Sequence, residues 1–124
     1  MIQVLPITDR ETVRCFYEKS GLLFGEDSRG VVATAGDDTI GFCLFDLTER
    51  GILVLKLDPE NDPMLADGIL RAALHVAAER SAMDAHYAGT VSEALLEKLD
   101  FIVDRSEKRI DIDKLFRGCT CCHE

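Results

Sequence analysis

The fold of this chain is set by one continuous stretch, ILVLKLDPENDPMLADGILRAALHVAAER, which runs from Ile52 to Arg80. Its opening residues, Ile52 to Leu57, are almost entirely apolar, which is typical of a strand covered on both faces. The turn-forming segment DPEN at 58–61 ends that strand, Asp62 can cap a helix, and Pro63 suits a helical first turn. We therefore expect a central strand followed by a helix that ends near Arg80.

The predicted helix has one apolar stripe at helical spacing, and such a stripe indicates a face packed on a sheet. Its members are Leu65, Ile69, Leu70, Ala73, Leu74 and Ala77.

Before the central strand, the pattern predicts a strand over 2–7, a helix and a hairpin. Thr8 followed by Glu11 forms a capping box that would start the helix, and Gly21 can supply its left-handed stop. A polar loop over 25–30 precedes two apolar runs, 31–35 and 39–47, which read as the paired strands of a hairpin. The first half of the chain should therefore be mainly antiparallel.

After the long helix, residues 84–88 form another short β-rich run. Thr90 with Glu93 repeats the capping box and predicts a third helix that reaches Leu99. Residues 101–103 and 109–116 then read as an antiparallel pair that ends the domain. We expect one domain over 1–116 and a cysteine-rich tail over 117–124.

Composition excludes several classes of protein. The 124 residues are 47% hydrophobic and 30% charged, which suits a globular domain with one core. The formal net charge of -9 would repel a nucleic acid or an anionic bilayer, so neither is expected as a partner. No apolar run approaches the ~20 residues that span a bilayer. We expect a cytoplasmic protein, with Cys15 and Cys43 in its core.

Four segments, over 39–42, 57–60, 69–80 and 94–101, together resemble the GNAT superfamily of N-acetyltransferases. TIGF at 39–42 is similar to the opening of that family's third strand, and LDPE at 57–60 to the exit from its fourth. ILRAALHVAAER at 69–80 resembles the helix after the family's pyrophosphate loop, and ALLEKLDF at 94–101 resembles its late signature. The resemblance implies an α/β (α+β) fold in which three to four helices flank a mixed sheet of about six or seven strands.

The resemblance also implies an acetyl-CoA site after the fourth strand. There the family carries Arg or Gln, two spacers, Gly, one spacer and Gly or Ala, and bare backbone N–H groups cradle the pyrophosphate. The matching positions are Asn61, Met64 and Ala66, of which only Ala66 fits. Asp62 and Asp67 place carboxylates at the same donors, so acetyl-CoA should bind weakly or not at all. The expected coenzyme contacts are Leu55, Leu57, Asn61, Met64, Leu65, Ala66, Asp67 and Gly68.

Residues that the family uses to move protons are replaced. Leu96 stands where the resemblance implies a general-acid tyrosine, Gly89 where it implies an asparagine, and Gly51 where it implies a glutamate. His86 and Tyr87, on the strand that flanks the implied acyl cleft, are the remaining catalytic candidates. A strand alternates its faces, so only one of the two can point into that cleft.

The tail contains Cys119, Cys121, Cys122 and His123, a set of soft ligands suited to zinc. Adjacent cysteines and the lack of a second cysteine pair are unusual for a structural zinc site. Metal binding, thiol redox chemistry and an inert reduced tail all stay open.

Three functions follow as expectations. The first is an acyl-CoA-dependent N-acetyltransferase, with weak or absent activity, acting on a small-molecule or protein amine. The second is a non-catalytic binding or regulatory module of the same fold, and the third is a metal or redox protein that acts through the tail. The acidic surface favours a cationic amine. The sequence leaves the oligomeric state open.

Overall fold

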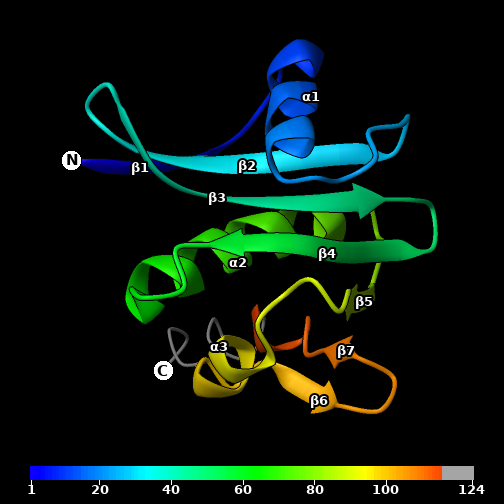
Figure 1. Cartoon of the computed structure of the whole chain (residues 1–124). Helices are drawn as coiled ribbons and strands as arrows, with labels where there is room; N and C mark the ends of the chain where they lie inside the picture. The colour runs from blue at the N-terminus through cyan, green and yellow to red at the C-terminus, as the bar shows by residue number, and fades with distance from the viewer. Residues whose placement is uncertain (116–124) are drawn as a thin grey trace.

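The computed structural model describes residues 1–115, which build one seven-stranded sheet and three helices (Figure 1). In chain order the elements are β1 (Ile2–Pro6), α1 (Arg10–Lys19), β2 (Ser28–Ala35), β3 (Asp38–Leu47), β4 (Gly51–Asp58), α2 (Pro63–Glu79), β5 (Asp84–Tyr87), α3 (Glu93–Lys98), β6 (Ile102–Asp104) and β7 (Arg109–Ile110).

The strands lie in the order β1-β2-β3-β4-β5-β7-β6, so β4 is the middle strand, as the apolar run predicts. All neighbouring strands are antiparallel except β4 and β5, which run parallel because α2 carries the chain back between them. The fold is therefore a mixed α+β sheet, which confirms the predicted class, strand number and central strand.

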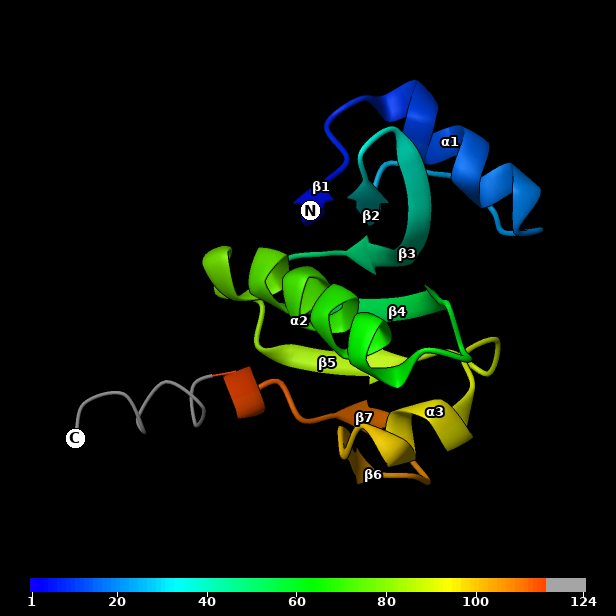
Figure 2. The ribbon, with the colours of Figure 1, turned by 90° about the vertical axis from the view of Figure 1, so that its left-hand side faces the viewer.

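The helices cover the two faces of the sheet unequally. Figure 2 shows α2 on one face and both α1 and α3 on the other. The buried stripe of α2 is Ala66, Ile69, Leu70, Ala73, Leu74 and Ala77, which packs on inward residues of β2, β3 and β4. Leu65, predicted in that stripe, is only half-buried at its edge.

A second, smaller cluster packs α1 on the opposite face. Val13 and Tyr17 are buried there against Leu44 of β3, with Leu55 of β4 at the margin. Cys43 is buried on the α2 face as predicted, but Cys15 is exposed, because α1 turns Val13 and Tyr17 towards the sheet instead. Within residues 1–115, no helix covers the central part of this face, between α1 and α3.

Three local predictions are wrong. Asp9, not Thr8, precedes α1, and its carboxylate accepts a hydrogen bond from the Thr12 hydroxyl. Ser92, not Thr90, caps α3 by accepting from the Leu95 N–H. β2 begins at Ser28, inside the predicted loop, because that residue pairs with β3.

The end of α1 follows the sequence pattern, whereas the last predicted strand is shorter than expected. Gly21 adopts the predicted left-handed conformation with φ of 73° after α1. The predicted last strand stops at Ile110, well before residue 116. Within residues 1–115, no helix is both long enough and apolar enough to cross a membrane.

Candidate functional site

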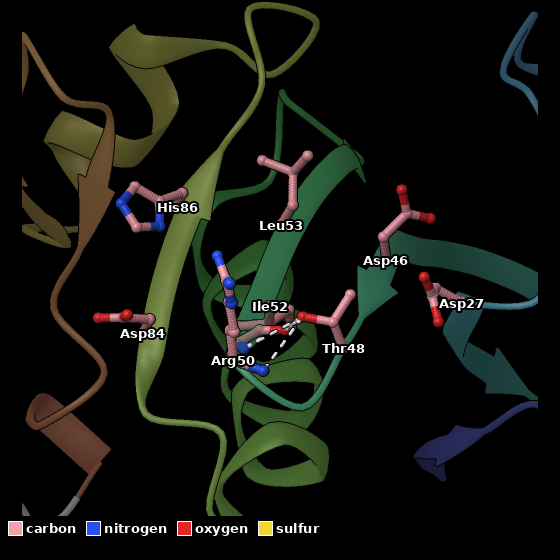
Figure 3. Close-up of a pocket in the computed structure, with 9 residues that line it drawn as sticks. Asp27, Asp46, Thr48, Arg50, Ile52, Leu53, Asp84 and His86 are labelled. Atoms are coloured by element: carbon pink, nitrogen blue, oxygen red, sulfur yellow. Dashed lines mark hydrogen bonds between the residues drawn. The ribbon is translucent and has the colours of Figure 1, made fainter.

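A pocket of about 480 Å³ opens on the sheet face between α1 and α3, at the end of the sheet where β4 and β5 begin (Figure 3). This volume lies within the range of small-molecule sites. The side chains that line it come from separate segments of the chain. Five of them are titratable or charged, namely Asp27, Asp46, Arg50, Asp84 and His86, and Leu53 is among the apolar ones.

Sheet register brings three of these side chains into one row. Asp46 of β3 pairs with Leu53 of β4, and Leu53 pairs with His86 of β5. Register partners share a face of the sheet, so a carboxyl group, an apolar chain and an imidazole follow one another across the open face. Leu53 remains 37% exposed, because neither α1 nor α3 reaches it.

Charged groups stand around this row. Figure 3 shows Asp27 and Asp46 together at one side, His86 and Asp84 at the other, and Arg50 between them. The Thr48 hydroxyl accepts hydrogen bonds from the Arg50 and Gly51 N–H groups, which fixes the β3–β4 turn that presents Arg50. When all are ionised, three carboxylates face one guanidinium.

Asp46 contacts a buried tyrosine of α1. The Tyr17 hydroxyl oxygen lies 2.7 Å from the Phe45 carbonyl and 3.2 Å from Asp46 Oδ1. Burial raises the pKa of Asp46 and the nearby Asp27 carboxylate raises it further, whereas a hydrogen bond received from Tyr17 would lower it. Burial likewise raises the pKa of Tyr17, so its hydroxyl stays protonated.

The two catalytic candidates point to different environments. His86 is half-buried and lines the pocket. Tyr87 is buried in the core, and its hydroxyl donates to Glu93 Oε2 at 2.8 Å. Burial and the Glu93 carboxylate raise the pKa of Tyr87. Only His86 reaches open space beside Leu53, and any catalytic role stays a prediction.

The implied coenzyme cleft lies beyond the last β4–β5 pair. Pairing stops at Val54 and Tyr87, and β4 carries a register shift at Leu55, one of the predicted coenzyme contacts. The Ala88 N–H donates to the Val54 carbonyl, and the Thr90 hydroxyl donates to the Leu55 carbonyl. Thr90 therefore bridges the opening between the two strands.

A small pocket of about 140 Å³ lies near this bridge, between Glu60 of the β4–α2 loop and Ser92 and Lys98 of the α3 region. That volume is below the usual range for ligand sites, so this pocket by itself would not hold a coenzyme.

The first turn of α2 does not fit a pyrophosphate. Pro63 has no N–H, the Asp62 carboxylate accepts from the Leu65 N–H at 3.2 Å, and the Ala66 N–H donates to the Asp62 carbonyl. Among residues 63–66, which form this turn, the Met64 N–H is the one backbone donor left. Met64 itself is 88% exposed. The Asp62 cap occupies the position that an anion would take.

The other predicted coenzyme contacts are dispersed. Leu57 is buried beneath α2, Asn61 is exposed, and Ala66 is buried. Gly68 lies inside α2, where a Cβ added to it would meet no atom within 4 Å. Asp67 was expected at the helix start but lies beyond the first turn, where it accepts from Arg71 Nε at 2.8 Å.

Two of the replaced proton-transfer positions are closed by packing. Leu96 is fully buried, so it contributes only to the core. A Cβ on Gly51 would overlap the Asp84 carbonyl group, so β5 approaches β4 too closely for a side chain there. Gly89 has free space around it.

Metal ligands are not grouped in the part of the chain that the structure describes, where no set of three or more His, Cys, Asp or Glu side chains could hold an ion. The predicted zinc ligands Cys119, Cys121, Cys122 and His123 lie outside residues 1–115. Their role stays a prediction.

Sequence reasoning missed the acidic side of the pocket. Asp46 interrupts the apolar run 42–47, and a carboxyl group inside a predicted strand is the signal that could have identified it. Asp27 carried no such signal, since it looked like one of several solvated turn residues. Its position beside Asp46 depends on where β2 starts.

Comparison with one solved structure supports the fold. A solved structure described as an acetyltransferase of the GNAT family from Desulfovibrio desulfuricans matches 70% of this chain and 72% of its own, with a TM-score of 0.50 and 16% identity. Nourseothricin acetyltransferase matches 63% of this chain and 51% of its own, with a TM-score of 0.48 and 23% identity. No protein-family model and no curated protein sequence matches. The chain has a GNAT-like fold.

Proposed function

We propose that this GNAT-fold chain is a non-catalytic module that binds a small organic cation, such as an alkyl amine, in the acidic pocket around Leu53. The observation that carries the proposal is the open row of Asp46, Leu53 and His86, with further carboxylates at both of its ends. An amine with a short alkyl chain matches this row, because the chain can cover Leu53 while the ammonium group meets a carboxylate.

Electrostatics favours a cation over an anion at this position. Three carboxyl groups from different segments outnumber the single guanidinium of Arg50, and the whole chain carries a net charge of -9. Asp46 is half-buried, which strengthens its attraction for a cation relative to that of an exposed carboxylate, while Asp27 and Asp84 are exposed. The same field opposes a coenzyme that carries several phosphates.

Loss of the pyrophosphate cradle argues against acetyl transfer. Asp62 and Pro63 remove two of the N–H donors that the first turn of α2 would offer, and Thr90 bridges the strands where an acyl group would enter. In this proposal the fold binds a ligand without catalysis, and the residues at the implied acetyl-CoA site stabilise the fold.

Weak N-acetyltransferase activity is the second candidate function. One observation favours it: β4 has its register shift at Leu55, beside the point where β5 diverges, and His86 lies on the pocket nearby. The two candidates differ in whether acetyl-CoA binds.

Titration calorimetry with n-butylammonium tests the proposal, with 1-butanol as a matched neutral control. We expect saturable binding of the cation and none of the alcohol, and Asp27→Asn combined with Asp84→Asn should weaken binding. The affinity should fall as salt is added, because part of it is electrostatic. Equal responses to both probes, or none to either, would reject the cation site.

A further inference from the structure

The Tyr17 hydroxyl has more acceptors around it than it has protons. Its oxygen lies 2.7 Å from the Phe45 carbonyl, 3.2 Å from Asp46 Oδ1 and 3.5 Å from the Arg29 carbonyl. A phenol donates one hydrogen bond and accepts others. The closest and most buried of these acceptors is the Phe45 carbonyl, so it is the best-placed acceptor for the Tyr17 proton.

This assignment leaves two oxygens, Tyr17 Oη and Asp46 Oδ1, in contact without a proton from the tyrosine. An ionised carboxylate only accepts, so this contact would be unfavourable for a charged Asp46. A protonated carboxyl group can donate to the phenol oxygen and complete the contact. The site is half-buried, so an incomplete contact there is costly.

We propose that Asp46 holds a proton in the free protein, at pH values where an exposed aspartate has lost it, and donates it to Tyr17. This inference rests on the proposed cation site for its second part: entry of an ammonium ion into the pocket ionises Asp46 and releases that proton to solvent. The pocket thus exchanges a proton for an organic cation.

The groups that face Asp46 are consistent with a neutral carboxyl. Burial opposes the ionisation of Asp46 most strongly and Asp27, in the turn before β2, adds to this effect, whereas a hydrogen bond received from Tyr17 would favour the ionised form. Arg29 of β2 directs its guanidinium to the Glu26 and Ser28 carbonyls, not to Asp46. Arg50 of the β3–β4 turn and His86 of β5 lie across the pocket, beyond Leu53.

Proton linkage predicts how the stability of the protein changes with pH if Asp46 is protonated. A carboxyl whose pKa is raised by folding contributes stability that is complete below its unfolded pKa and is lost as pH rises through its folded pKa. Asp46→Asn keeps a neutral donor of the same shape at every pH. The melting temperature of the variant should therefore match that of the wild type near the ordinary pKa of aspartate and exceed it at higher pH, by a difference that grows until the pH passes the raised pKa of Asp46.

The ligand-free experiment compares thermal unfolding of wild type, Asp46→Asn and Asp84→Asn across that pH range, together with a carbon NMR titration of the Asp46 carboxyl. Asp84→Asn is the matched control, because Asp84 lies on the other side of the pocket from Tyr17. An Asp46→Asn variant that loses stability relative to wild type as pH rises would overturn the proposal, as would an Asp46 that titrates like an exposed aspartate.

The second arm measures proton release when n-butylammonium binds, by calorimetry in buffers of different ionisation enthalpy. We expect release of up to one proton by the wild type and none by Asp46→Asn. Binding without a difference between these proteins would overturn the exchange. Absence of binding would reject the proposed function, while the ligand-free arm still decides whether Asp46 holds the proton.

Discussion

Leu53 of β4 and His86 of β5 are register partners in the one parallel strand pair of the described sheet. Their side chains share the face between α1 and α3, and Asp46 continues the row on the other side of Leu53. The candidate site therefore lies where β4 and β5 are joined. The implied coenzyme cleft lies further along, where these strands separate.

Close contact between β4 and β5 predicts a strict requirement for glycine at position 51. A Cβ there would overlap the Asp84 carbonyl group, so Gly51→Ala must push β5 away. We expect it to cost at least about 3 kcal/mol in the free energy of unfolding, at the upper end of overpacking effects. Denaturant unfolding measures this cost.

Gly68→Ala is the matched control. Its Cβ would meet nothing within 4 Å, and Gly68 lies inside α2, where alanine favours the helix by about 1 kcal/mol. We expect Gly68→Ala to stabilise the protein slightly. A Gly51→Ala variant as stable as wild type would show that β4 and β5 do not approach each other this closely.

The Asp62 cap should contribute measurable stability. Asp62→Ala removes the acceptor for the Leu65 N–H and should cost about 1 kcal/mol, whereas Asp62→Asn keeps an acceptor and should cost less. Asp67→Ala breaks only the half-exposed pair with Arg71 and should cost about 0.5 kcal/mol or less. If Asp62→Ala leaves the free energy of unfolding unchanged, the Asp62 carboxylate does not hold the Leu65 N–H and would not compete with a pyrophosphate for it.

Removal of the Tyr17 hydroxyl should destabilise the α1 face. Tyr17→Phe leaves the Phe45 carbonyl without this buried donor, at a cost of about 1–3 kcal/mol. It also removes the acceptor for the Asp46 proton, so the Asp46 pKa should move back towards that of an ordinary aspartate. If the Asp46 pKa is the same in Tyr17→Phe as in the wild type, Tyr17 does not accept the Asp46 proton.

Local periodicity was sufficient to predict β4 and α2. The apolar run 52–57 and the stripe from Ile69 to Ala77 occupy adjacent parts of the chain, and each pattern matches one element. The Asp62 cap and Pro63 at the helix start were equally local signals. Thr8 and Thr90 were wrong as caps because other cap-forming residues, Asp9 and Ser92, lie within two positions of them.

The candidate pocket could not be predicted in the same way. Asp46, Leu53 and His86 meet only through pairing between strands, and the register beyond them shifts at Leu55, which no local pattern reveals. The direction of His86 and Tyr87 also depended on that register. Alternation showed that the two point to opposite faces, but not which face is open.

Titration of the protein with acetyl-CoA, followed by thermal unfolding, tests the central claim most directly. Any ligand present at 100 times its dissociation constant should stabilise the fold by about 2.7 kcal/mol. We expect no saturable shift with micromolar acetyl-CoA, and partial recovery of binding when Met64→Gly is combined with Asp62→Asn and Asp67→Asn. A clear upward shift of the wild type at micromolar acetyl-CoA would contradict the account.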